Sequence, residues 1–178
     1  LKRLHDDNPP VMYAAPVPAN TTNKPYALDG NISVYEPDTN GDCKPDKVWL
    51  YLTMRRGGRF IYALDVTDKA NPKFLWKKSN ADTGYDELGQ TWSELKPFLL
   101  ADRTPALIFG AGYDPAVEDR PFLSAAAGYG NPPSSTKSMG RGVFIVDAQT
   151  GTVLKFFGPS TQTGQTTAMQ DSVPSDVS

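Results

Sequence analysis

The chain of 178 residues has one cysteine and one histidine, two residue types that often build metal and catalytic centres. The single cysteine, Cys43, permits no disulfide bond within the chain. Neighbouring carboxylates disfavour its thiolate, so we do not expect a reactive nucleophile. His5 has no histidine or cysteine close to it in the sequence, which argues against zinc. The chain also lacks an apolar run that approaches the length of a bilayer span, so we expect no membrane insertion by this segment.

An excess of one charge is also missing. Eighteen Lys and Arg residues stand against twenty Asp and Glu residues, and the net charge is −2. Nucleic acids and anionic membranes attract proteins through clustered basic charge. We therefore expect neither of them as a partner.

Glycine and proline are abundant, with 15 and 16 residues, and they fall between short apolar runs. This arrangement favours an all-β protein rich in loops. Several runs are continuous rather than alternating, which indicates strands that are covered on both faces. The central strands of a β-propeller blade have this environment, because they lie between neighbouring blades. We expect strands at residues 48–54, 60–64, 74–76, 106–109, 143–146 and 153–157.

Two segments resemble copies of one structural unit. Residues 60–65 end in Asp65 and lead through a turn to a strand at 73–76, and residues 143–147 end in Asp147 and lead to a strand at 152–156. We expect both carboxylates to accept hydrogen bonds from turn amides, which is a structural role. Two full blades and parts of a third and a fourth cannot close a ring that needs at least about four. The sequence therefore predicts a partial β-propeller, part of a larger one whose remaining blades lie outside this segment.

An acidic loop carries the strongest chemical signal. Oxygen-bearing side chains recur at alternating positions, and calcium takes six to eight oxygen ligands at roughly 2.3–2.6 Å. The expected ligands are the side chains of Asp38, Asn40, Asp42 and Asp46 and the backbone carbonyl of Lys44. An Asx-rich surface turn without metal is the alternative, since the same residues favour turns. The loop departs from the EF-hand pattern, because Cys43 replaces its turn glycine and Trp49 its bidentate glutamate.

No catalytic constellation is visible in the sequence. There is no Ser/His/Asp set and no loop that would cradle a phosphate, so we do not expect an enzyme. Asp86 and Glu87 are adjacent and would point to opposite faces of a strand, so we interpret them as solvated charges. We expect Trp49, Trp76 and Trp92 to pack between blades rather than to stack on a ligand.

Six segments, in this order, resemble motifs of the C-terminal β-propeller of PilY-type type IV pilus proteins. They are 26–30 (YALDG), 62–68 (YALDVTD), 88–93 (LGQTWS), 108–114 (IFGAGYD), 146–151 (VDAQTG) and 172–177 (SVPSDV). The resemblance covers residues 26–178. It leaves 1–25 as an irregular lead-in and 112–142 as an insertion. Members of this family bind calcium in a loop that residues 38–46 match, apart from Cys43 in place of the usual glycine.

The resemblance implies a non-enzymatic module of pilus assembly and adhesion at the tip of a type IV pilus, outside the cell or associated with the outer membrane. Its implied partners are minor pilins, the pilus tip complex and a host or surface ligand. Calcium in the loop would support attachment and twitching motility. Two alternatives are a propeller dehydrogenase with pyrroloquinoline quinone and a metal-free scaffold propeller of the cell envelope. The dehydrogenase draws its metal ligands from several blades, whereas the ligands here lie in one loop.

Overall fold

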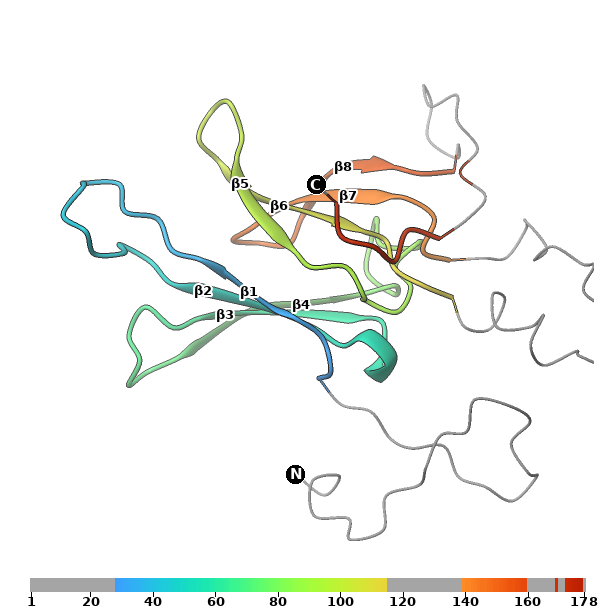
Figure 1. Ribbon diagram of the computed structural model, residues 1–178, viewed down its shortest axis with the longest axis horizontal. Helices are drawn as coiled ribbons and strands as arrows, with labels where there is room; N and C mark the ends of the chain where they lie inside the picture. Colours follow the sequence, from blue (N-terminus) through green and yellow to red (C-terminus); the bar gives the residue numbers. More distant parts are fainter. Residues whose placement is uncertain (1–27, 115–138, 160–168, 170–171, 178) are drawn as a thin grey trace, which may run out of the picture.

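The computed structural model describes residues 28–114, 139–159, 169 and 172–177, and within these residues two antiparallel sheets of four strands form. In each sheet consecutive strands are neighbours, which is the meander of a propeller blade (Figure 1). The first sheet contains β1 (Ile32–Tyr35), β2 (Trp49–Thr53), β3 (Phe60–Asp65) and β4 (Lys73–Ser79). The second contains β5 (Lys96–Leu99), β6 (Pro105–Gly110), β7 (Val143–Asp147) and β8 (Val153–Phe157). The fold is therefore all-β and of the β-propeller type.

All six predicted strands are present, with bounds that shift by a few residues. The sequence did not predict β1 and β5, the first strand of each sheet. Both have four residues and form an edge of their sheet. Pro97 lies within β5, and such an edge position tolerates proline because one side of the strand needs no ladder hydrogen bonds. The two strands come close to one another across the sheets, as innermost strands do near a propeller axis.

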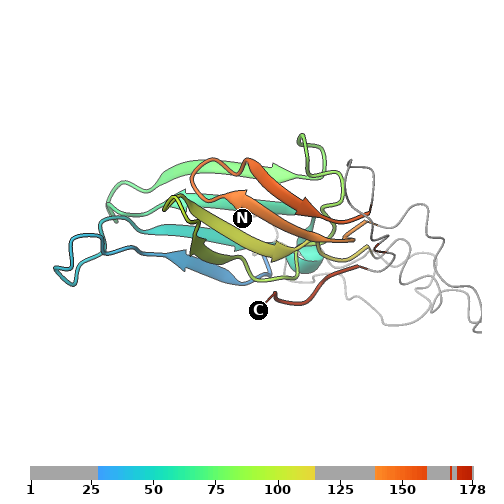
Figure 2. The same cartoon turned by 90° about the horizontal axis from the view of Figure 1, so that it is seen from above.

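The core lies between the two sheets, which form two layers in Figures 1 and 2. Phe144 of β7 is at its centre, because its ring lies 5.3 Å from that of Tyr85, 5.4 Å from that of Phe109 and 4.5 Å from that of Phe156. Alternate residues of the strands supply the rest, since side chains of a strand point to opposite faces in turn. The core also includes Trp49, Tyr51, Ile61, Ala63, Trp76, Leu107 and Val146.

Three hydrogen bonds connect side chains from the first sheet and from the segment after it to the turn between β7 and β8. The hydroxyl of Tyr51 and the indole N–H of Trp76 both donate to the Ala148 carbonyl, at 3.0 and 3.1 Å. The hydroxyl of Tyr85 donates to the Gly151 carbonyl at 2.7 Å. Buried carbonyls need partners, so these bonds fix how the two sheets pack.

The predicted repeat is confirmed, because 60–64 and 143–146 lie in β3 and β7, the third strands of their sheets. The pairing of each with the next strand shifts register at the same place, between Ala63 and Leu64 and between Ile145 and Val146. The aspartates that follow both accept turn amides. Asp65 Oδ1 accepts the N–H of Thr67 at 2.9 Å, and Asp147 Oδ1 accepts those of Gln149 and Thr150 at 2.9 and 2.7 Å.

Parts of the expected domain plan lie outside the described residues, namely the lead-in 1–25 and residues 115–138 of the expected insertion 112–142. The ends of that insertion are described and pack against the sheets. Gly112 forms a β-bridge with Val173, and the N–H of Val173 donates to the Gly140 carbonyl at 2.8 Å. Residues 172–177 thus cross the end of the second sheet (Figure 1). Among the described residues no helix is long and apolar enough to cross a membrane.

Candidate metal loop and neighbouring polar contacts

The acidic loop joins β1 to β2 and projects from the end of the first sheet (Figure 1). The five predicted ligands, Asp38, Asn40, Asp42, Lys44 and Asp46, all lie on it and are exposed. The loop is closed at its base by the Asp46 N–H, which donates to the Pro37 carbonyl at 2.8 Å. The neighbouring strands hold the base, so the tip is free to meet solvent ions.

Side-chain oxygens of the loop accept backbone amides of the loop itself. Asp38 accepts the N–H of Gly41 at 2.7 Å through Oδ1 and that of Cys43 at 2.9 Å through Oδ2. Asn40 Oδ1 accepts the N–H of Asp42, and Asp42 Oδ1 accepts that of Lys44, both at 2.9 Å. The contacts of Asn40 and Asp42 are Asx turns, and together with those of Asp38 they define the tip of the loop.

Asp46 is bonded to the start of the loop. Its Oδ2 accepts both the N–H of Thr39, at 2.8 Å, and the Thr39 hydroxyl. The hydrogen bond from the Thr39 side chain, followed by that from its backbone N–H, lowers the pKa of the Asp46 carboxyl below its ordinary value of 3.8. The carboxylate is therefore charged at neutral pH, as a calcium ligand must be.

Cys43 adopts the backbone conformation that glycine would supply. Its φ is +63°, and that of Gly41 is +76°. A left-handed conformation costs a residue with a Cβ atom roughly 1–2 kcal/mol. Cysteine thus adopts this left-handed turn conformation at an energetic cost that glycine would avoid.

Chemically the loop suits calcium, because carboxylate, carboxamide and carbonyl oxygens are the hard donors that this ion prefers. The structure keeps the predicted ligands on one short loop but does not gather them. Among the described residues no group of three His, Cys, Asp or Glu side chains lies together as metal ligands. A bound cation would have to exchange some side-chain contacts with loop amides for contacts with itself.

The segment 88–93 joins the two sheets through its side chains. The Thr91 hydroxyl donates to the Phe60 carbonyl at 3.1 Å and accepts the Met54 N–H at 2.8 Å, which ties it to the first sheet. Ser93 Oγ accepts the N–H of Gly110 in the second sheet at 3.0 Å. A Cβ atom on Gly89 would lie 2.6 Å from the Tyr113 carbonyl oxygen, so glycine permits the close approach.

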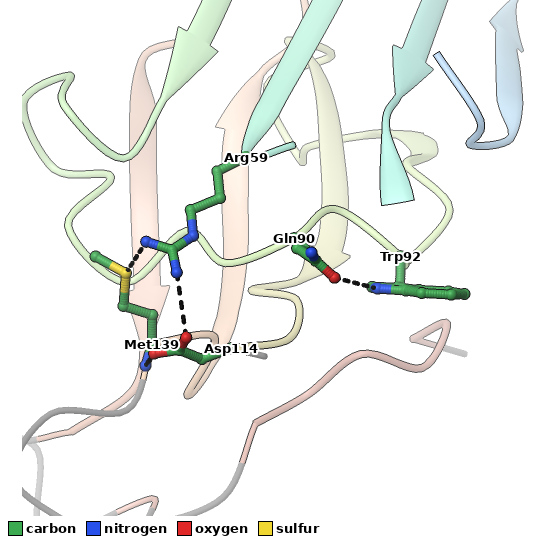
Figure 3. Close-up of polar contacts among 5 residues, drawn as sticks. All are labelled: Arg59, Gln90, Trp92, Asp114 and Met139. Atoms are coloured by element: carbon green, nitrogen blue, oxygen red, sulfur yellow. Dashed lines mark hydrogen bonds and ion pairs between the residues drawn. The ribbon is translucent and has the colours of Figure 1, made fainter. Parts of the chain in front are cut away.

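Two ion pairs beside this segment were not predicted from the sequence. Arg59 Nη2 lies 3.1 Å from Asp114 Oδ1, and Asp114 Oδ2 also accepts the N–H of Met139 at 3.1 Å (Figure 3). Arg141 Nη2 lies 2.6 Å from Glu87 Oε1. The interpretation of Glu87 as a solvated charge was therefore wrong. Asp86 and Glu87 lie in a turn rather than a strand, and the turn directs Glu87 toward β7.

The three tryptophans divide into two environments. Trp49 and Trp76 are buried in the core between the sheets, as predicted. Trp92 is only partly buried, and its indole N–H donates to Gln90 Oε1 at 3.2 Å (Figure 3). It lines a pocket of about 360 Å³ together with Asn31, Arg55, Pro174, Ser175 and Asp176. Sequence reasoning missed the pocket because its lining comes from segments far apart in the chain.

With two four-stranded meanders packed through a shared core, the chain has the architecture of neighbouring propeller blades. Its fold resembles the crystal structure of the Pseudomonas aeruginosa PilY1 C-terminal domain, with a TM-score of 0.51 and 24% identity, over 77% of this chain and 23% of that chain. A second comparison finds 42% identity over 60 residues with the type IV pilus biogenesis factor PilY1 homolog of Xylella fastidiosa. These two similarities confirm the resemblance to a PilY-type C-terminal domain.

The similarity to the curated relative covers 34% of this chain and 5% of that protein. No family model matches the chain. The chain therefore corresponds to a small part of its relatives, and the activity of a whole protein is a matter for the proposal that follows.

Proposed function

We propose that the chain is a non-enzymatic part of a type IV pilus biogenesis factor that acts outside the cell at the pilus tip. The observation that carries the proposal is the 42% identity over 60 residues with a protein named as a type IV pilus biogenesis factor. The likeness to the fold of a PilY1 C-terminal domain supports it independently. In this role the chain takes part in pilus assembly, surface attachment and twitching motility, with minor pilins of the tip complex and a host or surface ligand as its partners.

Calcium bound at residues 38–46 completes the proposal. The ion would be held by Asp38, Asn40, Asp42 and Asp46 and by the carbonyl of Lys44, and it would neutralise three carboxylates that repel one another. Since the loop projects from the end of the first sheet (Figure 1), a bound ion would make it rigid without disturbing the core. The role of the ion is structural, and no chemical step depends on it.

The remaining blades of the propeller would pack on the outer face of the first sheet. Ile32 and Val34 of β1 and Phe74 of β4 are exposed large apolar residues. By register they share this face with Leu50, Leu52, Tyr62 and Leu64. Apolar sheet faces of this extent are covered in stable proteins. The covering sheet would come from the same polypeptide, because the relatives are much longer than this chain.

The test is a deletion of residues 26–178 within the gene of the full-length protein. Surface pili, measured in the sheared fraction, and the radius of the twitching zone should both fall. A matched strain with Asp68→Asn, at an exposed turn outside the loop, should resemble the wild type. Normal piliation and twitching in the deletion strain would refute the pilus assignment. Quinone-dependent alcohol oxidation by the purified protein would replace it with the dehydrogenase alternative.

A further inference from the structure

We propose that the pocket beside Trp92 binds a neutral saccharide, as a site separate from the metal loop. It is open to solvent, has a volume of about 360 Å³ and is lined by six residues from four separate segments. Small-molecule pockets measure about 300–1,000 Å³, so this one has room for a ligand of about one or two sugar rings.

The wall of the pocket is fixed by contacts that do not involve the ligand. Arg55 Nη2 donates to Asn31 Oδ1 at 2.9 Å, so these two side chains hold each other in place. Asp176 Oδ1 accepts the N–H of Glu94 at 2.6 Å, which anchors the opposite side. The indole N–H of Trp92 is bonded to Gln90 (Figure 3). The backbone of Gln90 in turn pairs with that of Tyr113. Such preorganisation lowers the entropy cost of binding.

Arg55 carries two signs of a site that is not fully satisfied. Its φ is +45°. This left-handed conformation is unfavourable for any residue that carries a side chain. Its Nε–H is buried and has no acceptor among the described residues. Its guanidinium lies 5.7 Å from the centre of the Trp92 ring. The strained backbone thus places the Arg55 guanidinium over the Trp92 ring, which the guanidinium of Arg56 also faces at 5.7 Å.

The mixture of groups selects the chemical class of the ligand. Asp176 is a carboxylate that repels anions, and Arg55 is a guanidinium that repels cations, so a neutral ligand is favoured. The Asn31 carboxamide and the Ser175 hydroxyl offer both donors and acceptors. Neighbouring hydroxyls of a sugar donate and accept in the same way. Trp92 and Pro174 supply apolar surface for its C–H face.

The test uses the purified full-length protein and saturation-transfer NMR, which observes the sugar rather than the large protein. The probes are the methyl glycosides of mannose, glucose, galactose and N-acetylglucosamine. At least one should receive saturation from the wild type. Trp92→Ala should weaken binding about tenfold or more, the equivalent of about 1.4 kcal/mol, and Trp92→Phe should restore part of it.

Asp176→Asn removes a charge but keeps an acceptor for Glu94, so the fold should persist while sugar binding falls. Its matched control is Asp102→Asn, at the exposed turn between β5 and β6, which should bind like the wild type. The proposal is overturned if no glycoside binds the folded protein, if binding is unchanged in Trp92→Ala, or if a tetraglutamate peptide binds in place of the sugars. Pilus assembly in Trp92→Ala should be normal, so failure here is distinct from failure of the pilus assignment.

Discussion

Arg59 and Asp114 form an ion pair between the two sheets, with 3.1 Å from the guanidinium Nη2 to the carboxylate Oδ1. Arg59 immediately precedes β3, and Asp114 lies four residues beyond the end of β6. The two members differ in environment, because the Asp114 side chain is 4% exposed and that of Arg59 is 30% exposed. The Asp114 carboxylate is thus the buried partner, and the Arg59 guanidinium helps to stabilise its charge in place of water.

Arg59→Met should therefore destabilise the fold by about 1–3 kcal/mol, because a buried carboxylate loses a charged donor. Urea unfolding of the full-length protein, followed by a probe in this domain, measures the change. Lys69→Met, on an exposed turn, is the control and should have little effect. A double-mutant cycle with Asp114→Asn isolates the coupling, and a coupling free energy near zero would contradict the assigned role.

The hydroxyls of Tyr51 and Tyr85, which bond to the turn between β7 and β8, should contribute unequally to the free energy of unfolding. Tyr85→Phe should cost about 1–2 kcal/mol, because the Gly151 carbonyl loses this donor. Tyr51→Phe should cost less, since the Ala148 carbonyl keeps its bond from the Trp76 indole. Thermal denaturation of both variants checks the order. Equal losses would show that Trp76 does not compensate.

Stability should also fall at alkaline pH. Burial raises the pKa of Tyr51 and Tyr85 above the ordinary value of 10.0. The folded state therefore keeps these hydroxyls neutral while the unfolded state ionises, so their contribution is complete below pH 10.0 and is lost as the pH rises further. The melting temperature of Tyr85→Phe should decline less steeply above that pH than that of the wild type. Parallel declines would refute this explanation.

Substitution by alanine should destabilise the fold more at Gly112, where residues 172–177 cross the second sheet, than at Gly41 in the metal loop. Gly112 and Gly41 both have positive φ, of +105° and +76°. A Cβ atom on Gly112 would lie 2.2 Å from the Gln90 carbonyl oxygen, whereas one on Gly41 would meet nothing within 4 Å. Gly41→Ala should then cost about 1 kcal/mol from backbone strain alone. Gly112→Ala should cost clearly more or prevent folding, as solubility and circular dichroism would reveal.

Calcium should stabilise the protein through the loop at 38–46. With a dissociation constant of about 10⁻⁵ M and millimolar calcium, binding to the native state adds about 2.7 kcal/mol. Asp42→Asn should lose most of this gain and yet melt like the wild type in chelator, because asparagine still accepts the Lys44 N–H. Asp68→Asn is the control outside the loop. Equal melting temperatures with calcium and with chelator in the wild type would contradict the metal assignment.

The sequence was sufficient for the elements whose signal is local. Continuous apolar runs predicted the central strands, and Asp65 and Asp147 marked the repeat because an Asp-initiated turn depends on residues close in the chain. β1 and β5 escaped prediction since they are short edge strands, and Pro97 lowers the strand signal of β5. The role of residues 88–93, which connect the two sheets through their side chains, could be seen only in the structure.

The acidic loop could be predicted as a candidate site because its ligands lie within nine residues of one another. The contacts between Arg59 and Asp114 and between Glu87 and Arg141 could not, since each joins residues more than fifty positions apart. The pocket beside Trp92 has the same origin. Its wall forms only because residues 172–177 return to the start of β5. No pattern in the sequence predicts this return.

The return of residues 172–177 across the second sheet also has a mechanical consequence. This segment is held by the bonds of Val173 to Gly112 and Gly140 and by that of Asp176 to Glu94. A pulling force applied from its C-terminal side loads these few bonds before it reaches the ladders of the four-stranded sheets. Under tension residues 172–177 would detach first and open the Trp92 pocket, while both sheets remain intact.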